Sequence, residues 1–227
     1  TGLKSIPENL LPATTLDEAC YGYMFYLCTG LTTIPQDLLP AVNLKKYCYD
    51  GMFSDCSGLK SIPEKLLPAT TLTESCYAAM FSCCTGLTIV PENLLHSTTL
   101  AEGCYKSMFS SCTNLIGAPK LPATTLSRYC YSWMFANCTS LRRIKLPTMT
   151  YAFANGFFKN TTSLNVICYT GSTGLIIERI PTSLIKSIGD SAFEGTGYDV
   201  GINKQNFPIV EYIGSRAFAS SPVSHFE

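Results

Sequence analysis

Histidine is almost missing from this chain, and so are the motifs of most enzymes. Two of the 227 residues are histidine, one is tryptophan, and charged residues make up 14%. His96 replaces the proline of a repeated bend, which predicts a solvated loop residue, and His225 lies near the end of the chain. Catalysis needs an acid, a base or a nucleophile that converge in one place, and no G-x-S-x-G, phosphate-loop or H-E-x-x-H motif is present. The sequence therefore predicts that the protein is not an enzyme and holds no cofactor.

An excess of charge of one sign is also missing. Lysine plus arginine and aspartate plus glutamate number 16 each, so no net field attracts nucleic acid or anionic lipid. No apolar run approaches the roughly 18 residues that a membrane span needs, which argues against membrane insertion. Residues 1–7 match residues 29–35, so the chain opens inside a repeat. We therefore expect an export signal or lipid anchor upstream of Thr1.

The chain is rich in one repeated unit, Cys-Tyr-x-x-Met-Phe-x-x-Cys-x-x-Leu-x-x-x-Pro. Full copies occupy residues 20–35, 48–63, 76–91 and 104–119, and a fifth copy begins at Cys130. A period of this length indicates an elongated array of stacked coils, each of which contacts only its neighbours. Apolar residues make up 46% of the chain, which is enough to fill a core along such an array.

One phenylalanine marks the register of each unit, with successive steps of 28, 28, 28, 26, 23, 35 and 25 residues. Residues 1–141 therefore form Cys-rich repeats of 26–28 residues, whereas residues 142–227 form irregular repeats with insertions at 170–174 and 195–206. We expect the first insertion to loop outward. The marker phenylalanines are expected to form a buried column: Phe25, Phe53, Phe81, Phe109, Phe135, Phe158, Phe193 and Phe218.

Each unit predicts a short strand, a bend at proline and a helical turn. The strand is expected in Leu-x-x-Ile before Pro35 and its equivalents, because proline cannot donate to a ladder and ends the extended run. Alternation over residues 141–147 predicts a further strand. In Tyr-x-x-Met-Phe-x-x-Cys, apolar residues at i, i+3, i+4 and i+7 predict one face of about two helical turns.

The segments Ile188-Gly-Asp-Ser-Ala-Phe193 and Ile213-Gly-Ser-Arg-Ala-Phe218, with the Phe-x-x-Cys-x-x-Leu spacing, resemble the BspA-type leucine-rich repeat family. The first four units depart from that pattern, because they carry Cys-Tyr for Ile-Gly and Met for Ala. The resemblance implies an α/β repeat fold over residues 1–227: a single right-handed solenoid with short parallel strands, short helical turns and about eight coils. It also implies a secreted or surface-attached bacterial protein that acts in adhesion or binding.

Twelve cysteines are the strongest chemical signal in the sequence, and four interpretations compete. Zinc sites favour C-x₂₋₄-C pairs, which the C-x₇-C spacing does not supply. Redox catalysis favours C-x-x-C or an activated thiolate. Disulfides suit an exported protein, but cysteines eight apart on a helix lie about 12 Å from each other, beyond the roughly 7 Å limit. The favoured interpretation is two columns of small buried side chains, with Cys83 and Cys168 outside them: Cys20, Cys48, Cys76, Cys104, Cys130 and Cys28, Cys56, Cys84, Cys112, Cys138.

Tyrosines that follow the first cysteine of each unit are candidate contacts for a sugar or protein partner, since aromatics with a polar group are favoured at interfaces. The competing interpretation, which the column arrangement favours, is that they are half-buried supports between coils: Tyr21, Tyr49, Tyr77, Tyr105 and Tyr131. Positions that vary between copies are expected to be exposed: 22–23, 50–51, 78–79, 106–107 and 132–133. Tyr23 and Trp133 are the strongest single candidates there. The predicted function is a binding or adhesion module for a host or neighbouring-cell protein or glycan, and the alternative is a structural spacer.

Overall fold

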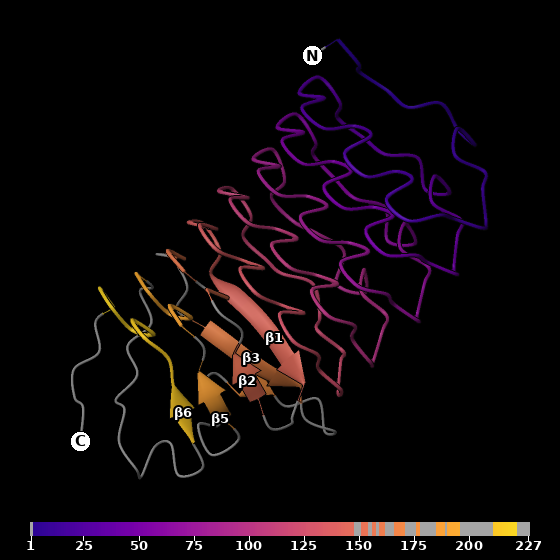
Figure 1. Cartoon of the computed structure of the whole chain (residues 1–227). Helices are drawn as coiled ribbons and strands as arrows, with labels where there is room; N and C mark the ends of the chain where they lie inside the picture. The colour runs from indigo at the N-terminus through magenta and orange to yellow at the C-terminus, as the bar shows by residue number, and fades with distance from the viewer. Residues whose placement is uncertain are drawn as a thin grey trace.

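The chain winds into coils that stack along one axis, with the N-terminal coils (indigo) at one end of the stack and the last described coils (yellow) at the other (Figure 1). The computed structural model describes residues 2–147, 151–153, 156–157, 159–161, 166–170, 176–177, 185–188, 190–195 and 211–221. Both insertions fall mainly outside these residues, as do Phe158 and His225. The right-handed winding, the count of about eight coils and the assignment of residues 1–227 to one domain stay predictions.

The strands lie in the C-terminal half of the stack (Figure 1). One sheet has the order β1-β3-β4, formed by Arg143–Pro147, Val166–Thr170 and Ile176–Ile177. The other has the order β2-β5-β6, formed by Tyr151–Phe153, Ile185–Ile188 and Tyr212–Ile213. All neighbouring strands are parallel except β3 and β4. The strand predicted at residues 141–147 is therefore confirmed as β1.

The strands predicted before Pro35 and its equivalents are wrong. Between residues 2 and 142 the extended segments meet only at isolated parallel bridges, which pair Thr15 with Asn43, Ile89 with Gly117 and Thr99 with Thr125. Only the bridge between Ile89 and Gly117 lies in the predicted segments, and the proline that follows each of these residues, Pro91 or Pro119, removes an N–H group that a longer ladder would need. Neighbouring coils are therefore joined at single points on this side.

The predicted helical turns are also wrong, because no helix is present in the part of the chain that the structure describes. In the third coil the N–H groups of Tyr77 and Ala79 donate to Cys104 and Lys106 of the next coil, at 3.1 and 2.7 Å. The N–H groups between them donate three residues back, Ala78 to Ser75 at 3.2 Å and Met80 to Tyr77 at 3.4 Å. This turn segment, residues 74–83 in the third coil and the equivalent residues of the other coils, is thus a row of tight turns whose backbone pairs alternately within a coil and with the following coil.

Every fourth residue of this turn segment has a positive φ. In the second coil these residues are Tyr47, Gly51 and Asp55, with φ of 57°, 59° and 59°. Other coils place alanine, serine, cysteine and even tryptophan at equivalent positions, although side chains other than glycine and asparagine adopt this conformation at a cost. Hydrogen bonds to the neighbouring coil hold the conformation. The turn segment therefore repeats every four residues rather than every 3.6.

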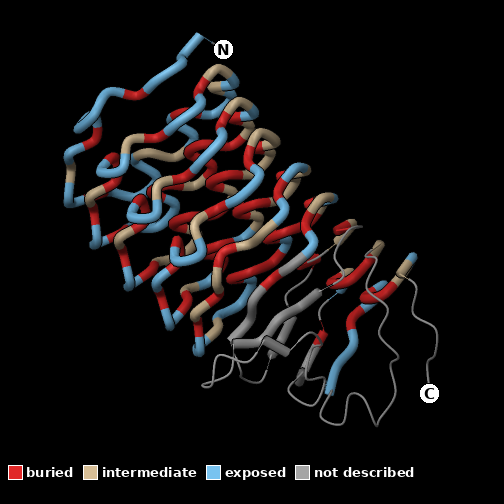
Figure 2. Tube along the Cα trace, turned by 180° about the vertical axis from the view of Figure 1, so that it is seen from behind, coloured by how far each residue is buried: buried red, intermediate tan, exposed pale blue. Residues whose placement is uncertain are grey.

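Stacked columns of like side chains fill the core. Phe25, Phe53, Phe81, Phe109 and Phe135 stack in series, with ring centroids 5.4 to 5.8 Å apart and planes within 10°. Phe193 and Phe218 form a further stacked pair at 5.3 Å. All seven are buried, so the predicted phenylalanine column is confirmed for its described members. Figure 2 shows buried residues at the same place in successive coils.

Candidate binding surface

The tyrosine column is a ladder inside the protein. Neighbouring rings from Tyr21 to Tyr131 stack 5.7 to 6.1 Å apart. Tyr21 in the first coil is half-buried, whereas the four that follow are buried: Tyr49, Tyr77, Tyr105 and Tyr131. Burial raises the pKa of Tyr77 and Tyr105 well above the ordinary value. A partner cannot reach these four rings in the folded protein, so they act as supports between coils.

Tyr23 is an exposed aromatic at a left-handed position of the first coil. Its φ is 56° and 53% of its surface is accessible. Its ring lies over Gly51 of the next coil, where an added Cβ would come within 2.4 Å of the ring. Tyr26 packs edge-on against it at 5.8 Å. The glycine at position 51 is therefore explained by the aromatic before it as well as by its own φ of 59°.

Trp133 occupies the same position four coils later. Its φ is 61° and its accessible fraction is 36%. Its ring covers Gly156, where a Cβ would lie 2.4 Å from the ring, and the ammonium group of Lys159 lies 5.4 Å from the ring centroid. A cation over the face of an indole is attracted by the ring quadrupole. Trp133 is thus both exposed and fixed in place by the coil that follows it.

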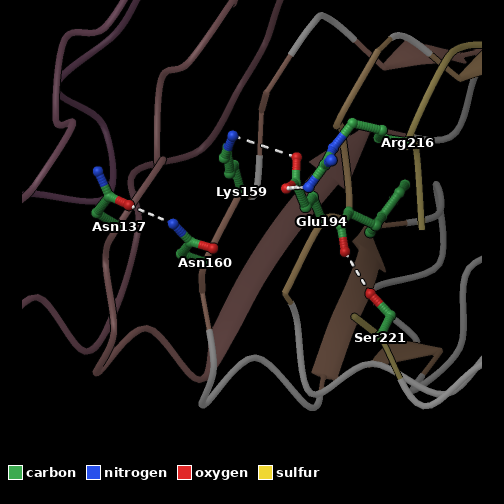
Figure 3. A network of polar contacts seen from close by, with 7 residues as sticks. Asn137, Lys159, Asn160, Glu194, Arg216 and Ser221 are labelled. Atoms are coloured by element: carbon green, nitrogen blue, oxygen red, sulfur yellow. Dashed lines mark hydrogen bonds and ion pairs between the residues drawn. The ribbon is translucent and has the colours of Figure 1, made fainter. Parts of the chain in front are cut away.

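A charged chain continues from Lys159 through the last coils (Figure 3). Lys159 forms an ion pair with Glu194 at 3.2 Å, and Arg216 forms another with the same carboxylate at 2.5 Å. Glu194 is largely buried. Its hydrogen bond from Arg216, with others from Ser191 and Lys159, lowers its pKa to about 2. One carboxylate therefore joins side chains from three successive coils.

Amide side chains form a second short ladder beside this chain (Figure 3). Asn160 donates its Nδ2 to Oδ1 of Asn137 at 2.8 Å, and Asn137 donates to the hydroxyl of Ser111 at 3.3 Å. Asn137 and Asn160 both have a positive φ, which asparagine tolerates better than most residues. These contacts bind the edge of the turn segment from coil to coil.

The prediction that all variable positions are exposed is wrong for part of the set. Tyr23, Lys106 and Trp133 are exposed, but Gly51, Ala78 and Ser132 are buried. The remaining four are half-buried: Gly22, Asp50, Ala79 and Ser107. Variation at Gly51 reflects the aromatic cover from the previous coil rather than contact with solvent.

The sequence reasoning missed a second set of exposed aromatics. Tyr47, Tyr129 and Tyr212 lie six residues before the marker phenylalanine of their coils and are 40 to 55% accessible. Each hydroxyl is held by a charged neighbour. Tyr47 donates to Glu74 at 2.7 Å, Arg128 donates to Tyr129 at 2.7 Å, and Tyr212 donates to Asp190 at 3.3 Å. Their constant distance from the phenylalanine was the signal that could have found them.

The cysteines are free thiols wherever their side chains are described, and eight of these eleven are buried. In the second column each buried thiol donates to the carbonyl oxygen of the marker phenylalanine one coil earlier, at 3.0 or 3.1 Å. Cys20 is exposed, and Cys28 and Cys83 are half-buried. The helix-based distance argument against disulfides fails with the helix, but the interpretation as buried side chains holds for the eight.

Burial also makes the thiols poor ligands and nucleophiles. It raises the pKa of Cys56 to about 11 and that of Cys76 to about 12, whereas metals and electrophiles react with the thiolate. Within the described residues, no group of three or more histidine, cysteine, aspartate or glutamate side chains could hold a metal ion. None of the described segments forms a helix long and apolar enough to cross a membrane.

Comparison with known proteins gives one clear match. The family described as "BspA type Leucine rich repeat region" matches residues 71–179 and 168–227, in six copies. No curated protein matches the chain. Among solved structures, a leucine-rich repeat protein from Eubacterium ventriosum superposes with a TM-score of 0.45 and 14% identity. The alignment covers 88% of this chain and 43% of the other, so this chain spans less than half of that protein.

Proposed function

The chain belongs to the BspA-type leucine-rich repeat family, and from this premise we propose that it is a non-catalytic module that binds a protein or glycan through its repeat surface. Repeats of this family are generally scaffolds for protein interaction rather than enzymes. We further propose that the protein works outside the cell or at the bacterial surface, where this family is typically found. The partner belongs to a host or a neighbouring cell.

The observation that carries the proposal is the contrast between a constant backbone and variable exposed side chains. In the turn segment, hydrogen bonds between coils fix the backbone in the same way from the first coil to the fifth. Side chains at the left-handed positions nevertheless change from alanine or serine to tyrosine or tryptophan. A frame of this kind can present different side chains without a change in fold, which is how repeat arrays recognise partners.

The exposed aromatics of the turn segment are the proposed contact residues. Tyr23, Tyr47, Tyr129 and Trp133 are each at least 36% accessible. Tyrosine and tryptophan are enriched among the residues that dominate binding energy. A typical protein partner covers about 800 Å² on each side, so it would span several coils. We therefore propose that aromatics from more than one coil act together.

A binding screen with matched variants tests this proposal. The chain is screened against extracellular matrix proteins and glycans, and the partner found is then titrated against Tyr23→Ser/Trp133→Ser. We expect at least a tenfold loss of affinity, since each aromatic anchor contributes about 2 kcal/mol or more. Ile89→Ser serves as the control, because Ile89 is 65% accessible and lies outside the turn segment. Equal affinity of both variants would exclude the turn segment as the contact face.

A structural spacer is the second candidate function, and one observation favours it. Stacked aromatic columns and paired backbone join coil to coil along the described array, which suits a stiff rod. A spacer needs no accessible aromatics at variable positions. The absence of any partner in the screen, with a folded protein, would favour the spacer.

A further inference from the structure

A hollow of about 440 Å³ opens between the third and fourth coils, at the residues that precede the turn segment in each coil. It is lined by residues 70–72 of one coil and 98–101 of the next. Four of these seven are threonines, and all four are exposed, whereas Leu72 and Leu100 lie buried beneath them. Its volume falls within the roughly 300–1,000 Å³ of small-molecule sites. We call it the threonine hollow.

Backbone groups at the threonine hollow lack the partners that the next pair of coils provides. Between the fourth and fifth coils, the N–H of Leu100 donates to Thr125 at 2.9 Å, and that of Thr125 donates to Thr98 at 3.0 Å. Among the described residues, no backbone hydrogen bond joins residues 70–72 to residues 98–100. By the same pattern, the N–H of Leu72 would donate to the carbonyl of Thr99. The coils are therefore open at this point.

One substitution within the repeat borders the threonine hollow. The carbonyl of Thr99 already accepts the hydroxyl of Ser97 at 2.6 Å. Ser97 is buried, and it replaces the alanine found at this position in the first, second, third and fifth copies. The same copy carries His96 in place of proline. Both departures from the repeat sequence therefore lie in the copy that supplies residues 98–101 of the hollow.

The chemistry of the lining selects a neutral ligand rich in hydroxyl groups. No lining residue carries a charge, and a buried charge without a partner is costly. Threonine hydroxyls donate and accept hydrogen bonds, and the N–H of Leu72 beside them makes no backbone hydrogen bond to residues 98–100. A peptide strand would need an open sheet edge, whereas these two edges face each other. We propose that the threonine hollow binds one neutral sugar unit of a glycan; this inference rests on the proposed binding role and adds a ligand class to it.

The test is a titration of the whole chain with neutral oligosaccharides, maltotriose and cellotriose, followed by the NMR shifts of backbone amides. We expect saturable shifts confined to residues 70–72 and 98–101. Thr70→Val/Thr98→Val removes two hydroxyls and should weaken binding about tenfold or more, at about 1 kcal/mol for each hydrogen bond. Thr14→Val removes an exposed hydroxyl from the same repeat position of the first coil and should bind as the parent does.

Three outcomes would overturn the inference. They are an absence of saturable shifts with both sugars, shifts outside the hollow, and equal binding by the parent and the double valine variant. Titration with a charged sugar or an extended peptide that shifts the same amides more strongly would overturn the ligand class. The proposed function is judged separately by protein binding, which the double valine variant should keep because the turn segment is untouched.

Discussion

At the residue scale, the phenylalanine column is a buried part of the core in the regular coils. Phe81 has no accessible surface and lies between Phe53 and Phe109, at 5.7 and 5.8 Å. Phe81→Ala should cost roughly 3–5 kcal/mol of unfolding free energy, measured by denaturant unfolding. Ala79→Ser changes a half-buried residue of the same coil and should cost little. Equal losses at the two positions would contradict the register.

The reactivity of each cysteine should follow the burial of its side chain. Alkylation of the native protein at pH 8 should label Cys20 first and the half-buried Cys28 and Cys83 more slowly. The eight buried thiols should resist, because burial hides them and raises their pKa, to about 11 at Cys48 and Cys130. Alkylation after denaturation, without reductant, should label most of the twelve cysteines. Mass spectra that show bridged peptides would contradict free thiols.

At the scale of the repeated element, the sequence predicted the apolar columns correctly but the backbone wrongly. The doublets Cys-Tyr and Met-Phe, followed by the second Cys, recur at a constant spacing of four residues. A helix has 3.6 residues per turn, so a strict period of four indicates successive turns instead. Glycine or asparagine at Gly51, Gly103, Asn137 and Asn160 marks the left-handed positions. Tyrosine and tryptophan are held at such positions by hydrogen bonds to the next coil. The sequence of one repeat does not reveal these bonds.

The pairing of an aromatic with the next glycine is a property of this element. Gly51→Ala should destabilise the protein by roughly 1–2 kcal/mol because of its positive φ, with a further cost from the contact with Tyr23. In a double-mutant cycle, Tyr23→Ser should remove the cost that comes from the contact with the Tyr23 ring. The cost that comes from the positive φ of residue 51 should remain. Gly117→Ala is the control, since an added Cβ there meets nothing within 4 Å. If the changes in unfolding free energy caused by Tyr23→Ser and Gly51→Ala simply add, the proposed packing of the Tyr23 ring over Gly51 would be contradicted.

At the scale of the whole molecule, the irregular C-terminal coils depend on charge as well as packing. The pKa of Glu194 is lowered to about 2 from an ordinary 4.5 by its hydrogen bonds from Arg216, Ser191 and Lys159. A carboxyl whose pKa is depressed by folding stabilises the protein above its unfolded pKa, and this stabilisation is lost as pH falls toward the folded value. The contribution should therefore be complete above about pH 4.5 and lost by about pH 2.

Thermal unfolding of Glu194→Gln measures this contribution. The variant should melt below the parent at pH 5.5. The gap should narrow at pH 2.5, where the carboxyl of the unfolded parent is protonated and most of the stabilisation by the folded carboxylate is lost. Glu8→Gln, at an exposed position of the first coil, serves as the control and should match the parent. A gap that stays constant between the two pH values would show that Glu194 acts through packing rather than charge.

The stack of coils could be predicted from the repeat, but the position of its exposed side chains could not. Tyr49, Tyr77 and Tyr105 share their column with Tyr21, yet only the first-coil ring is partly accessible. Exposure depends on which coil precedes and follows, and a repeat pattern does not contain that information. The exposure of Tyr23 and Trp133 could be predicted, because neighbouring repeats carry small residues at the same position.

Pairing of the turn segment from coil to coil is the central claim, because it fixes both the core columns and the exposed positions. Scalar couplings across hydrogen bonds, observed by NMR between amide nitrogens and carbonyl carbons, test it most directly. The account predicts couplings from Tyr77, Ala79 and Phe81 to the carbonyls of Cys104, Lys106 and Met108. Couplings from the same amides to carbonyls four residues earlier would indicate a helix and contradict it.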